Sequence, residues 1–155
     1  MPTIELTKGQ KEAKEKLLDW WKKRDKQVFT IAGLAGTGKT TSVSAFLEEL
    51  GVEKNEYALA TFTGKAALVL TRKGNPAYTL HKLMYDVVEI EKEDEKTGKI
   101  KKITKFVKKP FLDPFLRLII VDEVSMVSKK LLNDLLSFNI PIITLGDPLW
   151  LLERI

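Results

Sequence analysis

The most constraining feature of this chain is a glycine-rich octapeptide between a β-favouring run and an amphipathic helix. It fits the pattern G-x-x-x-x-G-K-[ST] and reads Gly33, Leu34, Ala35, Gly36, Thr37, Gly38, Lys39 and Thr40. The apolar run Val28–Ile31 precedes it, and from Val43 to Leu50 apolar residues recur at helical spacing until Gly51. The pattern therefore predicts a strand-to-helix turn that holds phosphates.

The residue types in this turn suit a nucleoside triphosphate with its Mg²⁺. Glycines let the backbone aim successive N–H groups at the phosphates, and the helix N-terminus adds partial positive charge. We expect Lys39 to reach the β- and γ-phosphates and the Thr40 hydroxyl to bind Mg²⁺. The predicted nucleotide-binding residues are Gly33, Ala35, Gly36, Thr37, Gly38, Lys39, Thr40 and Thr41. The alternative is a glycine-rich turn that only caps a buried helix.

Composition sets the outer bounds. With 155 residues, 44% of them hydrophobic, the chain suits one domain over residues 1–155. It has no cysteine and one histidine, which excludes disulfides and argues against a Cys or His metal centre. The start has no signal-peptide pattern, and no apolar run approaches the ~20 residues that span a bilayer, so we expect a soluble, intracellular, cytoplasmic protein without a membrane partner. The net charge of +5 suits a polyanion, but also a solvated lysine-rich surface.

Strands alternate with helices along the rest of the chain. Expected helices cover residues 7–23, the segment after the phosphate loop, 64–72, a turn at 79–84, and 128–138; expected strands cover 28–31, 57–61, 118–121 and 141–145. This alternation predicts an α/β fold, a parallel sheet with helices on both faces. In the first helix, Trp20 and Trp21 have the spacing of core residues, although stacking on bases is the alternative.

One segment, residues 87–109, breaks the alternation. Its charge density is high, its apolar residues alternate loosely, and Thr97-Gly98 supplies a turn near its middle. We interpret it as an inserted, protruding β-hairpin. A disordered loop, acidic and then basic, is the alternative.

The second chemical motif is the carboxylate pair Asp122-Glu123, which follows the apolar run Leu118–Val121. In open α/β sheets, ligands bind at the carboxyl ends of the strands, where the phosphate loop also leaves its strand. Asp122 is expected to hold Mg²⁺ through water, and Glu123 to orient and deprotonate the attacking water. The alternative is an ordinary solvated strand end.

Several segments resemble the motifs of superfamily 1B helicases of the RecD-like kind. Residues 121–127, Val-Asp-Glu-Val-Ser-Met-Val, look like motif II, usually D-E-A-S-M, and residues 61–67, Thr-Phe-Thr-Gly-Lys-Ala-Ala, look like motif Ia, usually T-P-T-G-K-A-A. Residues 79–81 resemble the T-I-H that follows, residues 6–10 the Q motif, and residues 146–149 the start of motif III. The resemblance implies a P-loop NTPase of the RecA-like kind that hydrolyses ATP to move on single-stranded DNA.

The resemblance also implies roles for single residues. Gln10 would contact adenine, although Thr7-x-x-Gln10 is also a helix capping box. The DNA-contacting residues would be Thr61, Thr63, Gly64, Lys65 and His81. An ordinary helix N-terminus with its caps is the alternative for the first four, and a surface or cap histidine for His81.

The chain also departs from the family pattern. Trp150 follows Leu149 where motif III usually has a glutamine that senses the γ-phosphate. The family's second RecA-like domain, with its arginine fingers and half of the DNA track, has no counterpart, so we expect the first motor domain alone. Such a domain would bind single-stranded DNA and hydrolyse ATP only weakly until a second domain completes it. A non-catalytic, ATP-dependent nucleic-acid or protein binding module is the alternative. The sequence does not indicate an oligomeric state.

Overall fold

The computed structural model describes residues 8–31 and 47–146, and its centre is a parallel sheet of five strands in the order β1-β7-β6-β2-β3. The strands, from one side of the sheet to the other, are β1 (Val28–Ile31), β7 (Ile142–Leu145), β6 (Leu118–Val121), β2 (Tyr57–Thr61) and β3 (Ala77–Thr79). Every pairing in this sheet is parallel. The predicted α/β class is thereby confirmed.

The register of the strands brings their carboxyl ends together. Ile31 lies opposite Leu145, and Val121 lies opposite both Thr144 and Ala60. Whatever follows β1, β7, β6 and β2 in the chain therefore starts at one side of the sheet, which we call the carboxyl edge. The amino edge is the opposite side, where Tyr57 and Leu118 begin their strands.

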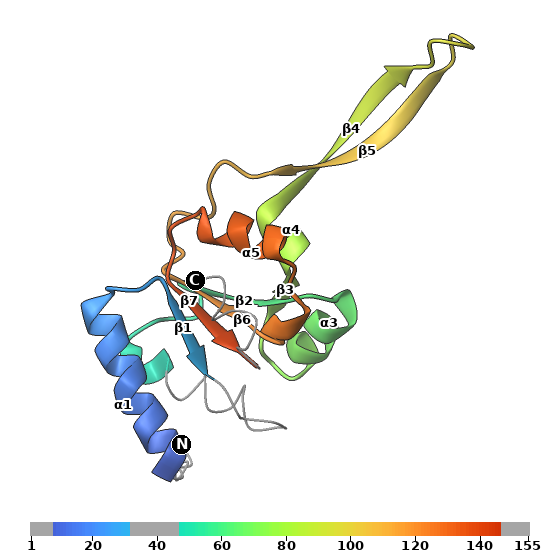
Figure 1. Cartoon of the computed structure of the whole chain (residues 1–155). Coiled ribbons are helices and arrows are strands. Elements are labelled where there is room, and N and C mark those ends of the chain that lie inside the picture. Colours follow the sequence, from blue (N-terminus) through green and yellow to red (C-terminus); the bar gives the residue numbers. More distant parts are fainter. Residues whose placement is uncertain (1–7, 32–46, 147–155) are drawn as a thin grey trace.

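Helices cover both faces of the sheet (Figure 1) because successive strand side chains point to opposite faces. Leu118 and Ile120 of β6 belong to one hydrophobic cluster, with side chains of α1 (Lys8–Lys23) and α3 (Gly64–Arg72). Ile119 and Val121 belong to the other, with side chains of α4 (Leu80–Met84) and α5 (Lys129–Leu136). A strand that is apolar throughout is thus explained by burial on both faces.

Local sequence signals account for the starts of two helices. The hydroxyls of Thr63 and Ser128 cap α3 and α5, accepting from the N–H groups of Ala66 and Leu131.

Trp20 and Trp21 are buried, so core packing is confirmed for both. The helix after Ser128 ends at Leu136, two residues before its expected end. The expected helical turn at 79–84 begins only at Leu80, because Thr79 closes β3, a strand too short to leave a periodic pattern.

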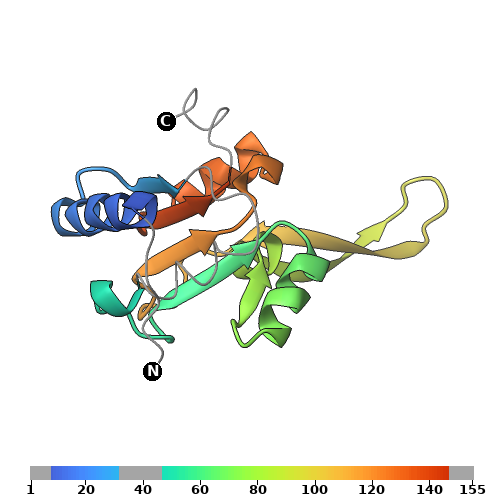
Figure 2. The same cartoon turned by 90° about the horizontal axis from the view of Figure 1, so that it is seen from below.

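The charged insertion is a β-hairpin that points away from the sheet (Figures 1 and 2), which confirms the hairpin interpretation. Its strands, β4 (Tyr85–Glu93) and β5 (Ile100–Lys108), are antiparallel. Gly98 has a φ of 66° in the turn, where glycine avoids the strain of a side chain. The hairpin begins two residues before the expected segment because Tyr85 already pairs with Lys108.

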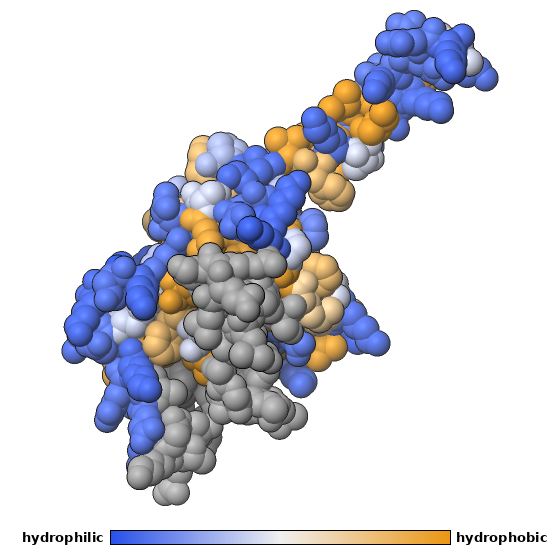
Figure 3. Space-filling view, in the orientation of Figure 1, coloured by the Kyte–Doolittle hydropathy of each residue, from blue (hydrophilic) through white to orange (hydrophobic). Residues whose placement is uncertain are grey.

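The two faces of the hairpin differ in charge. Directly opposite residues share a face, so the register places Glu89, Glu91 and Glu93 with Lys102 and Lys108 on one face, and Lys92, Lys101 and Lys105 with Asp86 on the other. The first face is mixed, and the second is mainly basic. Apolar cross-strand pairs, such as Ile90 with Ile103, lie nearer the middle. Figure 3 accordingly shows a hydrophobic middle and a hydrophilic tip.

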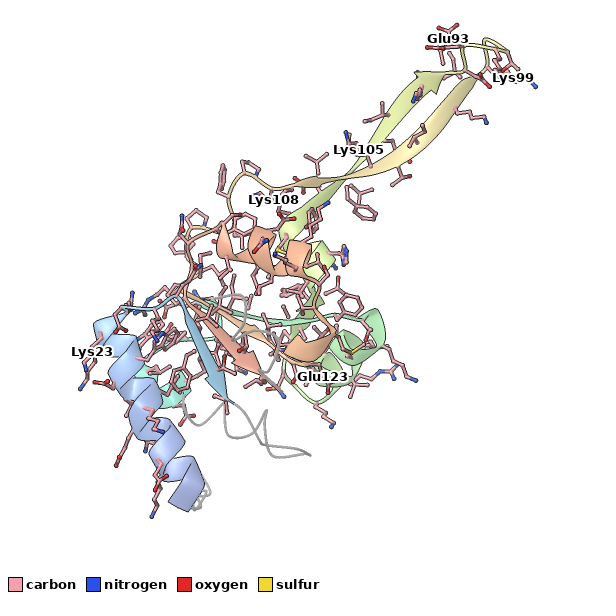
Figure 4. All side chains as sticks on the ribbon, viewed as in Figure 1. Lys23, Glu93, Lys99, Lys105, Lys108 and Glu123 are labelled. Carbon is pink, nitrogen blue, oxygen red and sulfur yellow. The ribbon has the colours of Figure 1, made fainter. Side chains whose placement is uncertain are left out.

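Polar contacts fix the root of the hairpin on α5. The Tyr85 hydroxyl donates a hydrogen bond to the carboxylate of Asp134, and burial together with that carboxylate raises the pKa of Tyr85 to about 12. Tyr85 therefore keeps its proton at any ordinary pH. From β5, Lys108 Nζ donates to Ser137 Oγ at 2.6 Å, beside α5 (Figure 4). Both strands of the hairpin are thus attached to the same helix end.

Candidate functional site at the carboxyl edge of the sheet

The carboxylate pair lies at the carboxyl edge, as expected from the sequence. The N–H of Asp122 donates to the carbonyl of Ala60 at 2.9 Å, so the residue is still held against β2 beyond the last residue of β6. The N–H of Glu123 donates to Oδ1 of Asp122 at 2.9 Å. Asp122 is half-buried and Glu123 is exposed. The pair therefore offers one anchored carboxylate and one that faces solvent.

Glu123 has an unusual backbone conformation. Its φ of 56° and ψ of 48° are left-handed, and it immediately precedes the 3₁₀ turn η1 (Val124–Met126). A residue with a side chain pays about 1–2 kcal/mol for that conformation. Such strain is often found at functional sites. In Figure 4, Glu123 lies far from Glu93 and Lys99, which are at the tip of the hairpin.

Gly146 packs closely behind this turn. Its φ is +123°, and a Cβ there would lie 3.5 Å from the backbone nitrogen of Val124 and 3.8 Å from Cα of Glu123. Its own N–H donates to the carbonyl of Ile31 at 3.3 Å. The end of β7 is therefore in contact with the ends of both β1 and β6. Gly146, the first residue of the segment that resembles motif III, therefore lies against the segment that resembles motif II.

The phosphate loop follows Ile31, so it leaves the sheet at this edge. The loop itself lies outside the described residues, together with each of its predicted contacts: Gly33, Ala35, Gly36, Thr37, Gly38, Lys39, Thr40 and Thr41. Gln10 belongs to the first turn of α1, but neither its side chain nor Thr7 is within the described part of the chain. The nucleotide contacts of all these residues stay predictions.

A second segment of predicted site residues leaves β2 at the same edge. Thr63, Gly64 and Lys65 are exposed at the start of α3. Thr61 differs from them, because it is 0% exposed and its hydroxyl donates to the carbonyl of Thr63 at 2.9 Å. A buried hydroxyl cannot touch a phosphate in this conformation. Thr61 instead holds the turn that presents the other three residues.

His81 lies at the root of the hairpin. Its side chain is exposed on α4, and its ring centroid is 5.7 Å from that of Tyr85 and 6.2 Å from that of Phe106. These ring contacts join α4 to both hairpin strands. Sequence reasoning missed this packing role, because it depends on a register between segments far apart in the chain.

Within residues 8–31 and 47–146, no group of three or more His, Asp or Glu side chains is arranged to hold a metal ion. Mg²⁺ does not need such a group, since it commonly keeps several waters and binds one or two carboxylates plus the phosphates of its substrate. Asp122 fits that donor set. In the same part of the chain, no helix is long and apolar enough to cross a bilayer.

Comparison with known proteins agrees with this geometry. Residues 20–151 match the AAA domain family. The chain belongs to that family. It is 33% identical over 148 residues to the ATP-dependent DNA helicase dda of Enterobacteria phage T4, an alignment that covers 92% of this chain and 32% of the helicase. The chain thus spans about a third of the length of this curated relative. A P-loop nucleotide-binding domain is supported, while the narrower RecD-like assignment stays a prediction.

The strain at Glu123 makes a testable prediction. Glu123→Gly should raise the free energy of unfolding by about 0.5–1 kcal/mol, because relief of the left-handed conformation exceeds the extra entropy that glycine loses on folding. Glu123→Gln keeps the strain and should change stability by less than about 0.5 kcal/mol. Urea denaturation of both variants measures the difference. A glycine variant no more stable than the glutamine variant would contradict the strain at this position.

Proposed function

We propose that this chain is the ATP-binding motor domain of a superfamily 1 DNA helicase, of the RecD-like kind. The observation that carries the proposal is the position of Asp122 and Glu123 at the edge where β1 ends and residues 33–40 follow. The AAA domain match and the similarity to a DNA helicase support it. In this proposal, ATP hydrolysis drives movement on single-stranded DNA.

Each part of the ATP site has a distinct task. Lys39 neutralises the β- and γ-phosphates, the backbone of the loop from Gly33 to Thr41 cradles them, and Gln10 reads the adenine edge. Thr40 and Asp122 are the residues that would hold Mg²⁺. When bound, that ion neutralises charge on the phosphates. Glu123, the exposed member of the pair, orients the attacking water and accepts its proton.

The DNA site uses the exposed start of α3. Thr63 and Lys65 offer a hydroxyl and an ammonium, and Gly64 lets a phosphate approach the helix N-terminus. Thr61 supports this turn through its hydrogen bond to Thr63. His81 extends the contact toward the root of the hairpin. The segment follows β2, and the N–H of Asp122 donates to the carbonyl of Ala60 in β2, so this strand connects the nucleotide site with the DNA contacts.

A second RecA-like domain, in cis or in trans, completes the motor. It closes on the carboxyl edge and supplies an arginine to the transferred phosphoryl group, a contribution of about 10³–10⁵ in rate in comparable nucleotidases. Closure and opening against that domain convert ATP turnover into movement.

The second candidate function is a binding module that uses ATP without hydrolysing it. It is favoured by the sequence after Leu149, where Trp150 stands in place of the sensing glutamine. Phosphate release in the presence of single-stranded DNA separates the two functions. A motor domain without its partner domain releases phosphate slowly but above background, and Glu123→Gln abolishes that release, whereas a binding module gives the same background for both proteins.

ATP binding should depend on Lys39. Lys39→Ala removes the ammonium that compensates the triphosphate charge, and should weaken Mg·ATP binding at least about tenfold. Lys26→Ala, an exposed lysine just before β1, is the matched control and should bind as the wild type does. Isothermal titration calorimetry measures all three proteins. Equal affinity of the Lys39 variant and the wild type would contradict the phosphate-loop assignment.

Binding to single-stranded DNA should weaken with salt, and Lys65 should account for part of that dependence. Each phosphate contact contributes about 0.7 to the slope of log K against log salt, so Lys65→Ala should lower the slope by about that amount. Lys73→Ala, at the other end of α3, should leave it unchanged. Fluorescence anisotropy with labelled oligothymidylate measures the slopes. An unchanged slope for Lys65→Ala would remove this residue from the DNA site.

A further inference from the structure

A groove of about 580 Å³ lies at the amino edge of the sheet, where β2 begins. We call it the amino-edge groove; the side chains that matter to it are those of Lys54, Tyr78, Lys82, Lys109, Phe111 and Asp113. Strand β2 has five residues, which puts about 13 Å between Tyr57 at the groove and Thr61 at the carboxyl edge. The groove extends from Tyr57 past Tyr78, which lies opposite Ala60, to Lys82, which follows the predicted DNA residue His81 in α4. Asp122 and Glu123 do not line it. Its proposed role does not rest on the proposed function.

Phe111 is displayed to solvent by a well-held loop. The chain returns here from the hairpin to β6 (Figure 1), and Phe111 is 72% exposed. Its neighbour Leu112 is buried in the core. Farther on, Oδ1 of Asp113 accepts the N–H of Phe115 at 3.0 Å, and the N–H of Arg117 reaches the carbonyl of Glu56 at 2.7 Å. The exposure of Phe111 is thus built into the fold and does not result from a loose loop.

Phe111 is accompanied in the groove by a second exposed aromatic ring. Tyr78 of β3 is 44% exposed and lines the same groove. Two large rings beside a concave surface form the kind of anchor site at which a few aromatic contacts dominate the binding of a protein partner.

The charge of the groove is positive. Lys54, Lys82 and Lys109 line it against a single carboxylate, Asp113. None of these lysines takes part in an ion pair within the described residues. Nζ of Lys109 lies 3.4 Å from the carbonyl oxygen of Lys82, which keeps the ammonium at the groove. The neighbouring carboxylate of Glu56 is paired with Arg117 at 3.1 Å and does not neutralise them.

We propose that the amino-edge groove binds an acidic peptide segment of a partner protein. An aromatic or large aliphatic side chain of the peptide packs between Phe111 and Tyr78, and its carboxylates face the three lysines. A nucleic acid fits less well, because it carries a phosphate on every nucleotide and the carboxylate of Asp113 also lines the groove. A peptide can place an uncharged residue at that point.

Selection from a random peptide display library on the immobilised chain tests the proposal. The enriched peptides should be net negative and should contain an aromatic or large aliphatic residue. A synthetic copy of an enriched peptide, labelled for anisotropy, should bind at least about tenfold more weakly to Phe111→Ser and Lys82→Glu. Phe115→Ser is the matched control: Phe115 belongs to the same loop and is also 72% exposed, but does not line the groove. Circular dichroism confirms that each variant is folded.

Four outcomes would overturn the proposal. They are a lack of enriched peptides, enriched peptides without excess acidic residues, equal losses for Phe111→Ser and Phe115→Ser, and displacement of the peptide by oligothymidylate, which would assign the groove to nucleic acid. Sedimentation velocity adds a fifth, since self-association that Phe111→Ser abolishes would assign the groove to a second copy of the chain. ATP binding is measured on the same proteins and should be unchanged in all three variants. A failure of the peptide proposal can therefore be told apart from a failure of the proposed function.

Discussion

The parallel register of four strands is the constraint on which the rest of the structure depends. Because Ile31 aligns with Leu145 and Val121 with Ala60 and Thr144, three segments that are far apart in the chain begin at the same edge of the sheet. These are the segment that continues into residues 33–40, the carboxylate pair after β6, and the exposed start of α3. None of them could form a site alone. The strands that hold them are buried on both faces, so their relative positions are fixed by core packing.

Backbone contacts beyond the strand pairing also hold the carboxyl ends of the strands together. The N–H of Gly146 donates to the carbonyl of Ile31, and its φ of +123° is one that glycine adopts without strain. The left-handed backbone at Glu123 follows Asp122 directly and starts the exposed turn after β6. The hairpin is held in a comparable way at the opposite end of α5, by Tyr85 and Lys108. Since α5 follows the carboxylate segment in the chain, one short stretch of sequence carries both the candidate catalytic residues and the support of the hairpin.

Sequence reasoning succeeded where the signals are local. The apolar run of β6, the Thr63 cap of α3 and the glycine turn of the hairpin each predicted the observed element, because burial, capping and turn geometry depend on nearby residues. It failed where neighbours distant in sequence decide the outcome. Strand β3 is defined by pairing with β2, and the packing of His81 on Phe106 depends on the fold of the hairpin. Thr61 is a separate case, because its partner Thr63 is close in sequence and no pattern marked its hydroxyl as buried. The contacts of Lys39, Thr40 and the other loop residues stay predictions, since the loop lies outside the described residues.

The central claim is that the carboxyl edge of the sheet binds Mg·ATP. Backbone amide NMR during titration with Mg²⁺ and a non-hydrolysable ATP analogue tests it most directly, because every described strand end then reports separately. The account predicts the largest shift changes at Ile31, Asp122, Glu123 and Gly146, and small ones at Tyr57 and Leu118, where the same strands begin. Changes concentrated at the amino edge, or an absence of change at Asp122 and Glu123 under saturating nucleotide, would contradict it.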